Sequence, residues 1–157
     1  VPLLDEDEIP DLVEAERVGV QLADRFAGAA GRAVDLATSS GSRLAGTLRE
    51  AGPDWIAVVA GRTLHVVRTG SIRWISGLDG PANPPAGAVR VGLAAVLRRI
   101  ARSALPVVAD LGGTVLRGTI TAVGADHCDL ATDSAVLTLP LDGLVSVRCD
   151  ADLLASL

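Results

Sequence analysis

The sequence predicts a mainly β protein with two helices, arranged as two five-stranded barrels that each follow an amphipathic helix. Two observations lead to this prediction. Short runs rich in Val, Leu and Ile are separated by Gly, Pro, Ser and Asp turn signals, which is typical of small antiparallel barrels. Two longer segments carry apolar residues at helical spacing, and the whole pattern occurs twice, 72 residues apart. We therefore expect duplication of a complete unit rather than a chance similarity.

The first unit is expected to begin with a helix from Pro10 to about Gly28, because apolar residues fall on one side of it at a period of 3.6. A second helix is predicted within residues 88–104, with Arg98, Arg99 and Arg102 opposite an apolar stripe. The strands expected after the first helix are 33–39, 43–50, 55–60, 63–69 and 71–76. Those expected after the second are 106–111, 115–123, 128–132, 135–141 and 144–149.

These elements divide the chain into five parts. We expect an acidic lead-in at residues 1–9, the first helix and barrel at 10–77, a Pro/Gly linker at 78–87, the second helix and barrel at 88–150, and a C-terminal tail at 151–157.

The stretch "GSRLAGTLREAGPDW" is repeated as "GTVLRGTITAVGADH". A Gly in the middle of each strand, Gly46 and Gly118, predicts a sharp bend or a close approach of another backbone. The Gly of the following turn, Gly52 or Gly124, is expected to take a positive φ, and the Asp after it to bond nearby backbone amides. The copies differ in Arg43 against Val115, Arg49 against Thr121 and Trp55 against His127, so we expect contacts to concentrate in the first half.

Composition narrows the function classes. The net charge is −5, all 14 basic residues are Arg, and residues 81–104 carry four Arg and no acid. No apolar run approaches the roughly 20 residues that a membrane helix needs, and the acidic start is unlike a signal peptide. We expect a soluble, cytoplasmic protein without a membrane partner.

No catalytic, cofactor or metal motif is found. Cys128 and Cys149 lack the spacing of a metal site and are expected to be buried free thiols. His127, Cys128 and Asp129 are adjacent, so neighbouring side chains would point to opposite faces of a strand. The sequence therefore predicts no catalytic residue, no cofactor and no metal, and a protein that is not an enzyme.

The helix and five strands, with "G-x-x-L-x-G-x-L" in the second strand, resemble the Sm-like fold of the Sm, LSm and Hfq proteins over almost the whole chain, twice. "VDLATSSGSRLAGTLREAG" resembles the first Sm motif and "VVRTGSIRWI" the second. The paired arrangement also resembles a group of actinobacterial proteins sometimes labelled Fis-type regulators, although the sequence has no helix-turn-helix pattern.

The resemblance implies RNA-binding positions that this chain mostly lacks. The loop Asp and Asn of Sm proteins correspond to Gly52 and Ile56 in the first half, and to Gly124 and Cys128 in the second. The Arg-Gly pair corresponds to Arg68-Thr69 and to Pro140-Leu141, so only Arg68 is retained.

The sequence supports two functions as expectations. The first is a non-enzymatic scaffold or protein-interaction module that self-associates through exposed barrel edges, as an internal pseudo-dimer or as a ring of three chains. The alternative is an RNA-binding regulator that uses Arg68, Arg73 and the Arg98, Arg99 and Arg102 cluster. That cluster is equally compatible with a solvated helix face or with ion pairs inside the protein.

The two tryptophans are candidate contact residues for either function. Trp55 and Trp74 could stack on bases, anchor a partner or plug the ends of a barrel. Because Trp74 lies in the last strand of the first unit, assembly is the role expected of it.

Overall fold

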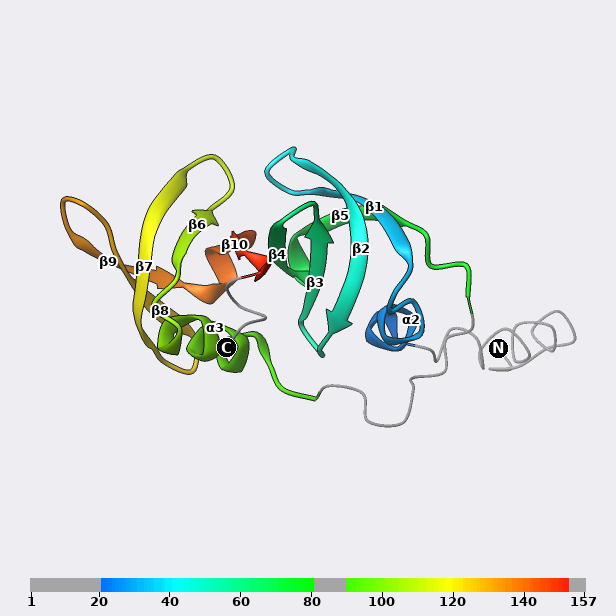
Figure 1. Cartoon of the computed structure of the whole chain (residues 1–157), viewed down its shortest axis with the longest axis horizontal. Coiled ribbons are helices and arrows are strands. Elements are labelled where there is room, and N and C mark those ends of the chain that lie inside the picture. The colour runs from blue at the N-terminus through cyan, green and yellow to red at the C-terminus, as the bar shows by residue number, and fades with distance from the viewer. Residues whose placement is uncertain (1–20, 81–89, 153–157) are drawn as a thin grey trace, which may run out of the picture.

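The computed structural model describes residues 21–80 and 90–152 (Figure 1). The acidic lead-in, most of the first predicted helix, most of the linker and most of the tail lie outside these ranges. The first unit contains α2 (Leu22–Gly28), β1 (Ala33–Thr38), β2 (Arg43–Ala51), β3 (Trp55–Ala60), β4 (Thr63–Arg68), the 3-10 turn η2 (Thr69–Ser71) and β5 (Ile72–Ser76). The second contains α3 (Leu93–Arg102), β6 (Pro106–Asp110), β7 (Val115–Val123), β8 (His127–Ala131), β9 (Val136–Pro140), η3 (Leu141–Gly143) and β10 (Ser146–Asp150). The predicted order of one helix and five strands in each unit is confirmed.

The two predicted barrels are open, and neither closes on itself. All ten strands belong to one antiparallel sheet in the order β5-β1-β2-β3-β4-β10-β6-β7-β8-β9. Within a unit, the fourth and fifth strands do not pair with each other, because the edge of β4 is occupied by β10 of the other unit. Figure 1 shows the two units on either side of this β4–β10 junction. Strand periodicity predicts where strands are, but not which edges meet.

The two units repeat each other in detail. The nine residues of β2 and the nine of β7 lie 72 positions apart, and both strands have a β-bulge at the same place, between Leu48 and Glu50 and between Ile120 and Ala122. A Cβ on Gly46 would overlap the carbonyl oxygen of the neighbouring strand, and so would one on Gly118. The close backbone approach predicted for both glycines is therefore confirmed.

The turn glycines behave differently from the prediction. Gly52 and Gly124 are not among the glycines with positive φ. A Cβ on Gly52 would instead collide with the Trp55 indole, and one on Gly124 with the His127 imidazole. Glycine is thus needed here because the ring three residues later folds back over the turn.

Two apolar cores lie on opposite faces of β3. Ile56 and Val58 point into the core of the first unit, with Phe26 of α2. Trp55 and Ala57 point into a larger core that includes α3 and most of the second unit. Because adjacent strand residues face opposite sides, β3 is apolar on both faces and joins the two cores. Each fully buried aliphatic side chain of this kind contributes about 1.5–3 kcal/mol to folding.

Helix α3 has the two-sided character that its sequence predicts. Leu93, Leu97 and Ile100 are buried, whereas Arg98, Arg99 and Arg102 are exposed. It packs mainly against β7 and β8 of its own unit. Among the residues that the structure describes, no helix is long and apolar enough to cross a membrane.

Candidate functional site

The junction between the units is the first place where predicted contact residues meet. Strands β4 and β10 pair from Thr63–Asp150 to Val67–Ser146. Arg68 adds a hydrogen bond from Nε to the Leu144 carbonyl oxygen, at 2.7 Å. Arg68, expected to contact nucleic acid or a partner, thus holds the second unit of its own chain.

Ser71 strengthens the same junction. Ser71 is 2% exposed and its hydroxyl lies 3.0 Å from the Val145 carbonyl oxygen, while the Arg68 amide donates to that same oxygen at 3.1 Å. A buried carbonyl left without donors is costly, so these bonds stabilise the junction just before β10 begins its pairing with β4.

His65 faces Arg148 across the junction, where the two residues pair in the ladder. Burial and the nearby Arg148 guanidinium lower the pKa of His65 below its ordinary value of 6.5, burial being the larger cause. Both effects disfavour the charged imidazole, so His65 is neutral at pH 7.

The turn after β2 connects the first unit to α3. The Asp54 carboxylate accepts a hydrogen bond from the Leu93 amide at 2.9 Å, at the start of the helix. The Trp55 indole is 2% exposed and donates from Nε1 to the Val91 carbonyl oxygen at 2.8 Å. Trp55 is therefore an internal anchor, and its ring faces are not free to stack on a base. Asp54 bonds an amide of the other unit rather than the nearby amides that the turn pattern suggested.

The two outer edges of the sheet are β5 and β9, and no described strand pairs with their outer sides. Trp74 of β5 is 46% exposed, and the Arg43 guanidinium lies 5.5 Å from the centroid of its ring. Arg43 also forms an ion pair with Asp35 at 2.7 Å, and this hydrogen-bonded guanidinium lowers the pKa of Asp35. Arg73, next to Trp74, is exposed. The structure thus places these two candidates together on one free edge.

The arginines of α3 do not form one cluster. Arg98 donates from Nη2 to the Gly124 carbonyl oxygen at 3.4 Å, in the turn between β7 and β8. Arg99 and Arg102 instead line a cavity of about 380 Å³ between α3 and the first unit. The seven predicted contact residues therefore separate into a junction, a free edge, a turn contact and a cavity wall.

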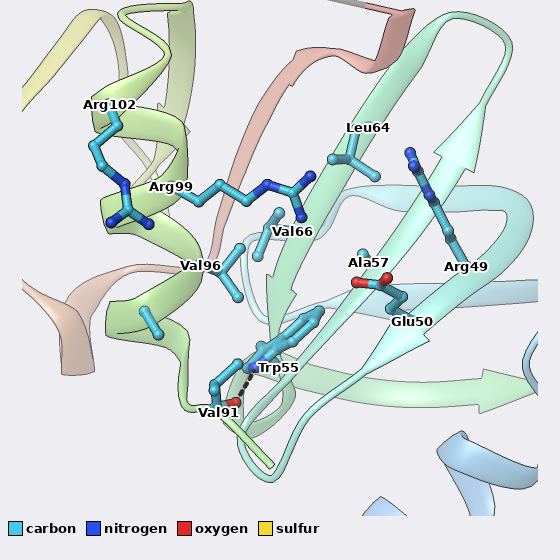
Figure 2. Close-up of a pocket in the computed structure, with 11 residues that line it drawn as sticks. Arg49, Glu50, Trp55, Ala57, Leu64, Val66, Val91, Val96, Arg99 and Arg102 are labelled. Atoms are coloured by element: carbon cyan, nitrogen blue, oxygen red, sulfur yellow. Dashed lines mark hydrogen bonds between the residues drawn. The ribbon is translucent and has the colours of Figure 1, made fainter. Parts of the chain in front are cut away.

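We call this space the α3 cavity. Its apolar wall is formed by Trp55, Ala57, Leu64, Val66, Val91, Ala95 and Val96, and its charged residues are Arg49, Glu50, Arg99 and Arg102. Figure 2 shows Arg99 reaching from the helix towards the strands and facing Arg49 across the opening, with Glu50 beside Arg49.

Sequence reasoning noticed Arg49 only as a difference between the copies, and it missed Glu50. The bulge leaves Arg49 without a partner residue in β3, so Arg49 and Glu50 are both exposed where strict alternation would bury one of them. The bulge itself followed from no signal in the sequence, although its repetition in β7 is a result of the duplication.

The remaining reactive groups are two buried thiols and one exposed His–Asp pair. Cys128 and Cys149 are buried and unbonded, as expected, and burial raises the pKa of both thiols. The His127 imidazole contacts the exposed Asp126 carboxylate at 2.8 Å and lowers its pKa. Within residues 21–80 and 90–152, no group of three or more His, Cys, Asp or Glu side chains is arranged to hold a metal ion.

No protein-family model matches the chain, and a search of the curated proteins finds no significant match.

Proposed function

We propose that this chain is an assembly module of two Sm-like units, in which the β5 edge of one molecule pairs with the β9 edge of the next. The observation that carries the proposal is the β4–β10 junction, which joins the fourth strand of one unit to the fifth strand of the other. The two free edges are the remaining strands of the same two kinds. Association between chains would thus repeat a contact that the chain already makes within itself.

The 72-residue equivalence gives a register for this contact. The internal pair Ser146–Val67 corresponds to Trp74 opposite Leu139. Trp74, nearly half exposed in the single chain, would be covered by the neighbouring β9. A large aromatic ring at a free strand edge is the kind of residue that dominates binding energy at interfaces.

The free edge does not carry every donor of the internal junction. Pro140 stands where Arg68 does, and Gly143 stands where Ser71 does. Proline has neither an amide hydrogen nor a guanidinium group, and glycine has no hydroxyl. The amide and Nε bonds of Arg68 and the hydroxyl bond of Ser71 therefore have no counterpart between chains. We infer a weaker, reversible association that depends on protein concentration.

This contact is head-to-tail, because it uses two different surfaces. Such contacts produce a closed ring if the rotation between molecules closes, and a filament if it does not. The Sm-like resemblance favours the ring, with three chains supplying six units.

To test this contact, we would place a charged side chain on one free edge in each of two variants. Trp74→Glu blocks β5, and Val136→Glu blocks β9, where Val136 is 63% exposed. By sedimentation velocity, the wild type should form concentration-dependent oligomers, each variant alone should be monomeric, and an equimolar mixture should form a dimer through the two intact edges.

Val115→Glu is the matched control, because Val115 is 56% exposed but lies in β7, inside the sheet. It should assemble like the wild type. A wild-type chain that is monomeric at all concentrations would overturn the proposal, and variants that still self-associate would overturn the choice of edges.

RNA binding is the alternative function, with less support because Arg68 is occupied by the Leu144 carbonyl. Anisotropy titrations with short A-rich and U-rich RNAs at two salt concentrations test it. Saturable binding that is lost when Arg98, Arg99 and Arg102 are changed to Ala would support it, and no binding at micromolar protein would exclude it.

A further inference from the structure

We propose that the α3 cavity binds a small amphipathic anion, in which a compact apolar body carries a phosphate or carboxylate group. The cavity volume of about 380 Å³ lies within the range of about 300–1,000 Å³ that is usual for small-molecule sites. The proposal concerns a different surface from the strand edges, and it does not depend on assembly.

The charge at the opening selects an anion. Arg49, Arg99 and Arg102 surround the space with a single carboxylate, that of Glu50. Among the residues that the structure describes, none of these three arginines forms an ion pair or donates a side-chain hydrogen bond. Two elements thus bring three guanidinium groups without a protein acceptor to one opening, where a phosphate or carboxylate could accept charge-assisted hydrogen bonds from them.

The wall selects an apolar body. Leu64 and Val66 of β4 and Ala57 of β3 are buried, and they face Val96 of α3 (Figure 2). The only donor of the Trp55 indole is occupied by the Val91 carbonyl, as the dashed line in Figure 2 marks, so Trp55 adds no hydrogen-bond donor to this wall. An anion without an apolar part, such as inorganic phosphate, would leave this wall unused.

The residues that characterise this site are not repeated in the second unit. Thr121 stands in place of Arg49, Ala122 in place of Glu50, and the exposed His127 in place of Trp55. The cavity is completed by α3, which packs mainly on its own second unit and contributes Ala95, Val96, Arg99 and Arg102 to the lining. The site therefore exists because the two units are joined in one chain.

Tryptophan fluorescence can report binding directly. The chain has two Trp, so in the Trp74→Phe background all indole emission comes from Trp55, which lines the cavity. Adding Val136→Glu, which blocks the β9 edge, to this background separates the measurement from self-association. The probes are phenyl phosphate, which has both chemical parts, inorganic phosphate, which has the charge alone, and phenol, which has the ring alone.

Phenyl phosphate should change Trp55 emission saturably, with an affinity at least about tenfold higher than that of either partial probe. Added Arg99→Gln and Arg102→Gln substitutions should weaken binding of phenyl phosphate by about tenfold or more, because charge-assisted hydrogen bonds are lost. The matched control is the Arg62→Gln, Arg117→Gln pair, which removes the same charge from exposed positions outside the cavity and should bind like its parent.

A thermal melt of each variant checks that it is folded. The proposal would be overturned if the folded parent did not bind phenyl phosphate. It would also be overturned if the Arg99/Arg102 and Arg62/Arg117 variants bound phenyl phosphate with equal affinity. Equal binding of phenol and phenyl phosphate would overturn its anionic part.

Discussion

The first and second units have the same local structure but use it differently, most clearly in the turn after the bulged strand. In both, the Gly amide of the turn donates to the carbonyl of the ring-bearing residue, at 2.9 Å for Gly52–Trp55 and 2.8 Å for Gly124–His127. The Trp55 ring is buried against the segment before α3, whereas the His127 side chain is exposed, covers Gly124 and has its neighbour Asp126 as its hydrogen-bond partner.

The next element of the chain accounts for this difference. The first unit is followed by α3, whose first amide at Leu93 bonds the Asp54 carboxylate of this turn. The residue that follows the second unit, Ala151, instead donates its amide to the Arg62 carbonyl oxygen of the first unit, away from the turn that carries His127. The same turn can therefore be an internal anchor or an exposed loop, depending on the element that comes after its unit.

The sheet edges show the same contrast. At the junction, Arg68 and Ser71 supply side-chain donors, and at the free edge Pro140 and Gly143 stand in their places. Of the duplicated strands, β4 and β10 are thus paired inside the chain, whereas their counterparts β9 and β5 form outer edges that lack these side-chain donors. Proline near a free edge is a known way to limit uncontrolled strand addition.

The strongest test of the turn comparison is to truncate both rings. Trp55→Ala should lower the free energy of unfolding by about 3–5 kcal/mol, because it removes a fully buried aromatic ring and its hydrogen bond to Val91. His127→Ala should change it by less than about 0.5 kcal/mol, since its ring is exposed. Urea denaturation measures both. Equal losses would mean that the two turns are equally integrated into the fold.

The next effect is expected at the junction. Arg68→Ala should destabilise the chain by about 1.5–3 kcal/mol, because the Leu144 carbonyl loses a charged donor. Arg73→Ala, which removes the same charge from the free β5 edge, should be close to neutral. Similar losses in the two denaturation curves would contradict the role given to Arg68.

Loss of the inter-unit cap should have a smaller effect. Asp54→Ala removes the acceptor of the first amide of α3 and should cost about 1 kcal/mol, the usual size of a capping contribution. The Asp126 carboxylate at the equivalent turn contacts His127 and is not bonded to a helix amide. Asp126→Ala should therefore have little effect on stability. Hydrogen exchange at the Leu93 amide gives a local readout, because it should accelerate in the first variant only.

The smallest effect concerns pH. The pKa of His65 is lowered in the folded state, so its stabilising contribution is complete above 6.5, the ordinary pKa of histidine, and is lost as pH falls through the folded pKa. The midpoint of thermal unfolding should decrease below pH 6.5 in the wild type and decrease less in His65→Gln. NMR titration of the His65 ring should give a pKa below 6.5, and a value above it would contradict the buried, Arg148-facing environment.

Much of the fold could be predicted because it depends on local pattern. Alternating β-branched residues, Gly-containing turns and one apolar helix face located every strand and α3, and the strand at 115–123 was predicted to the residue. The close approach at Gly46 and Gly118 also followed from sequence, because only glycine permits it.

Edge pairing and the sites that depend on it required the tertiary structure. The backbone groups of a strand edge are the same in any sequence, so nothing local distinguishes a strand that closes its own barrel from one that pairs with the other unit. The burial of Trp55 and the α3 cavity depend on residues far apart in the chain, such as Trp55 and Val91. The sequence by itself thus determined two repeated units and their glycine bends, whereas long-range packing decided that they share one open sheet with Arg68 inside its junction.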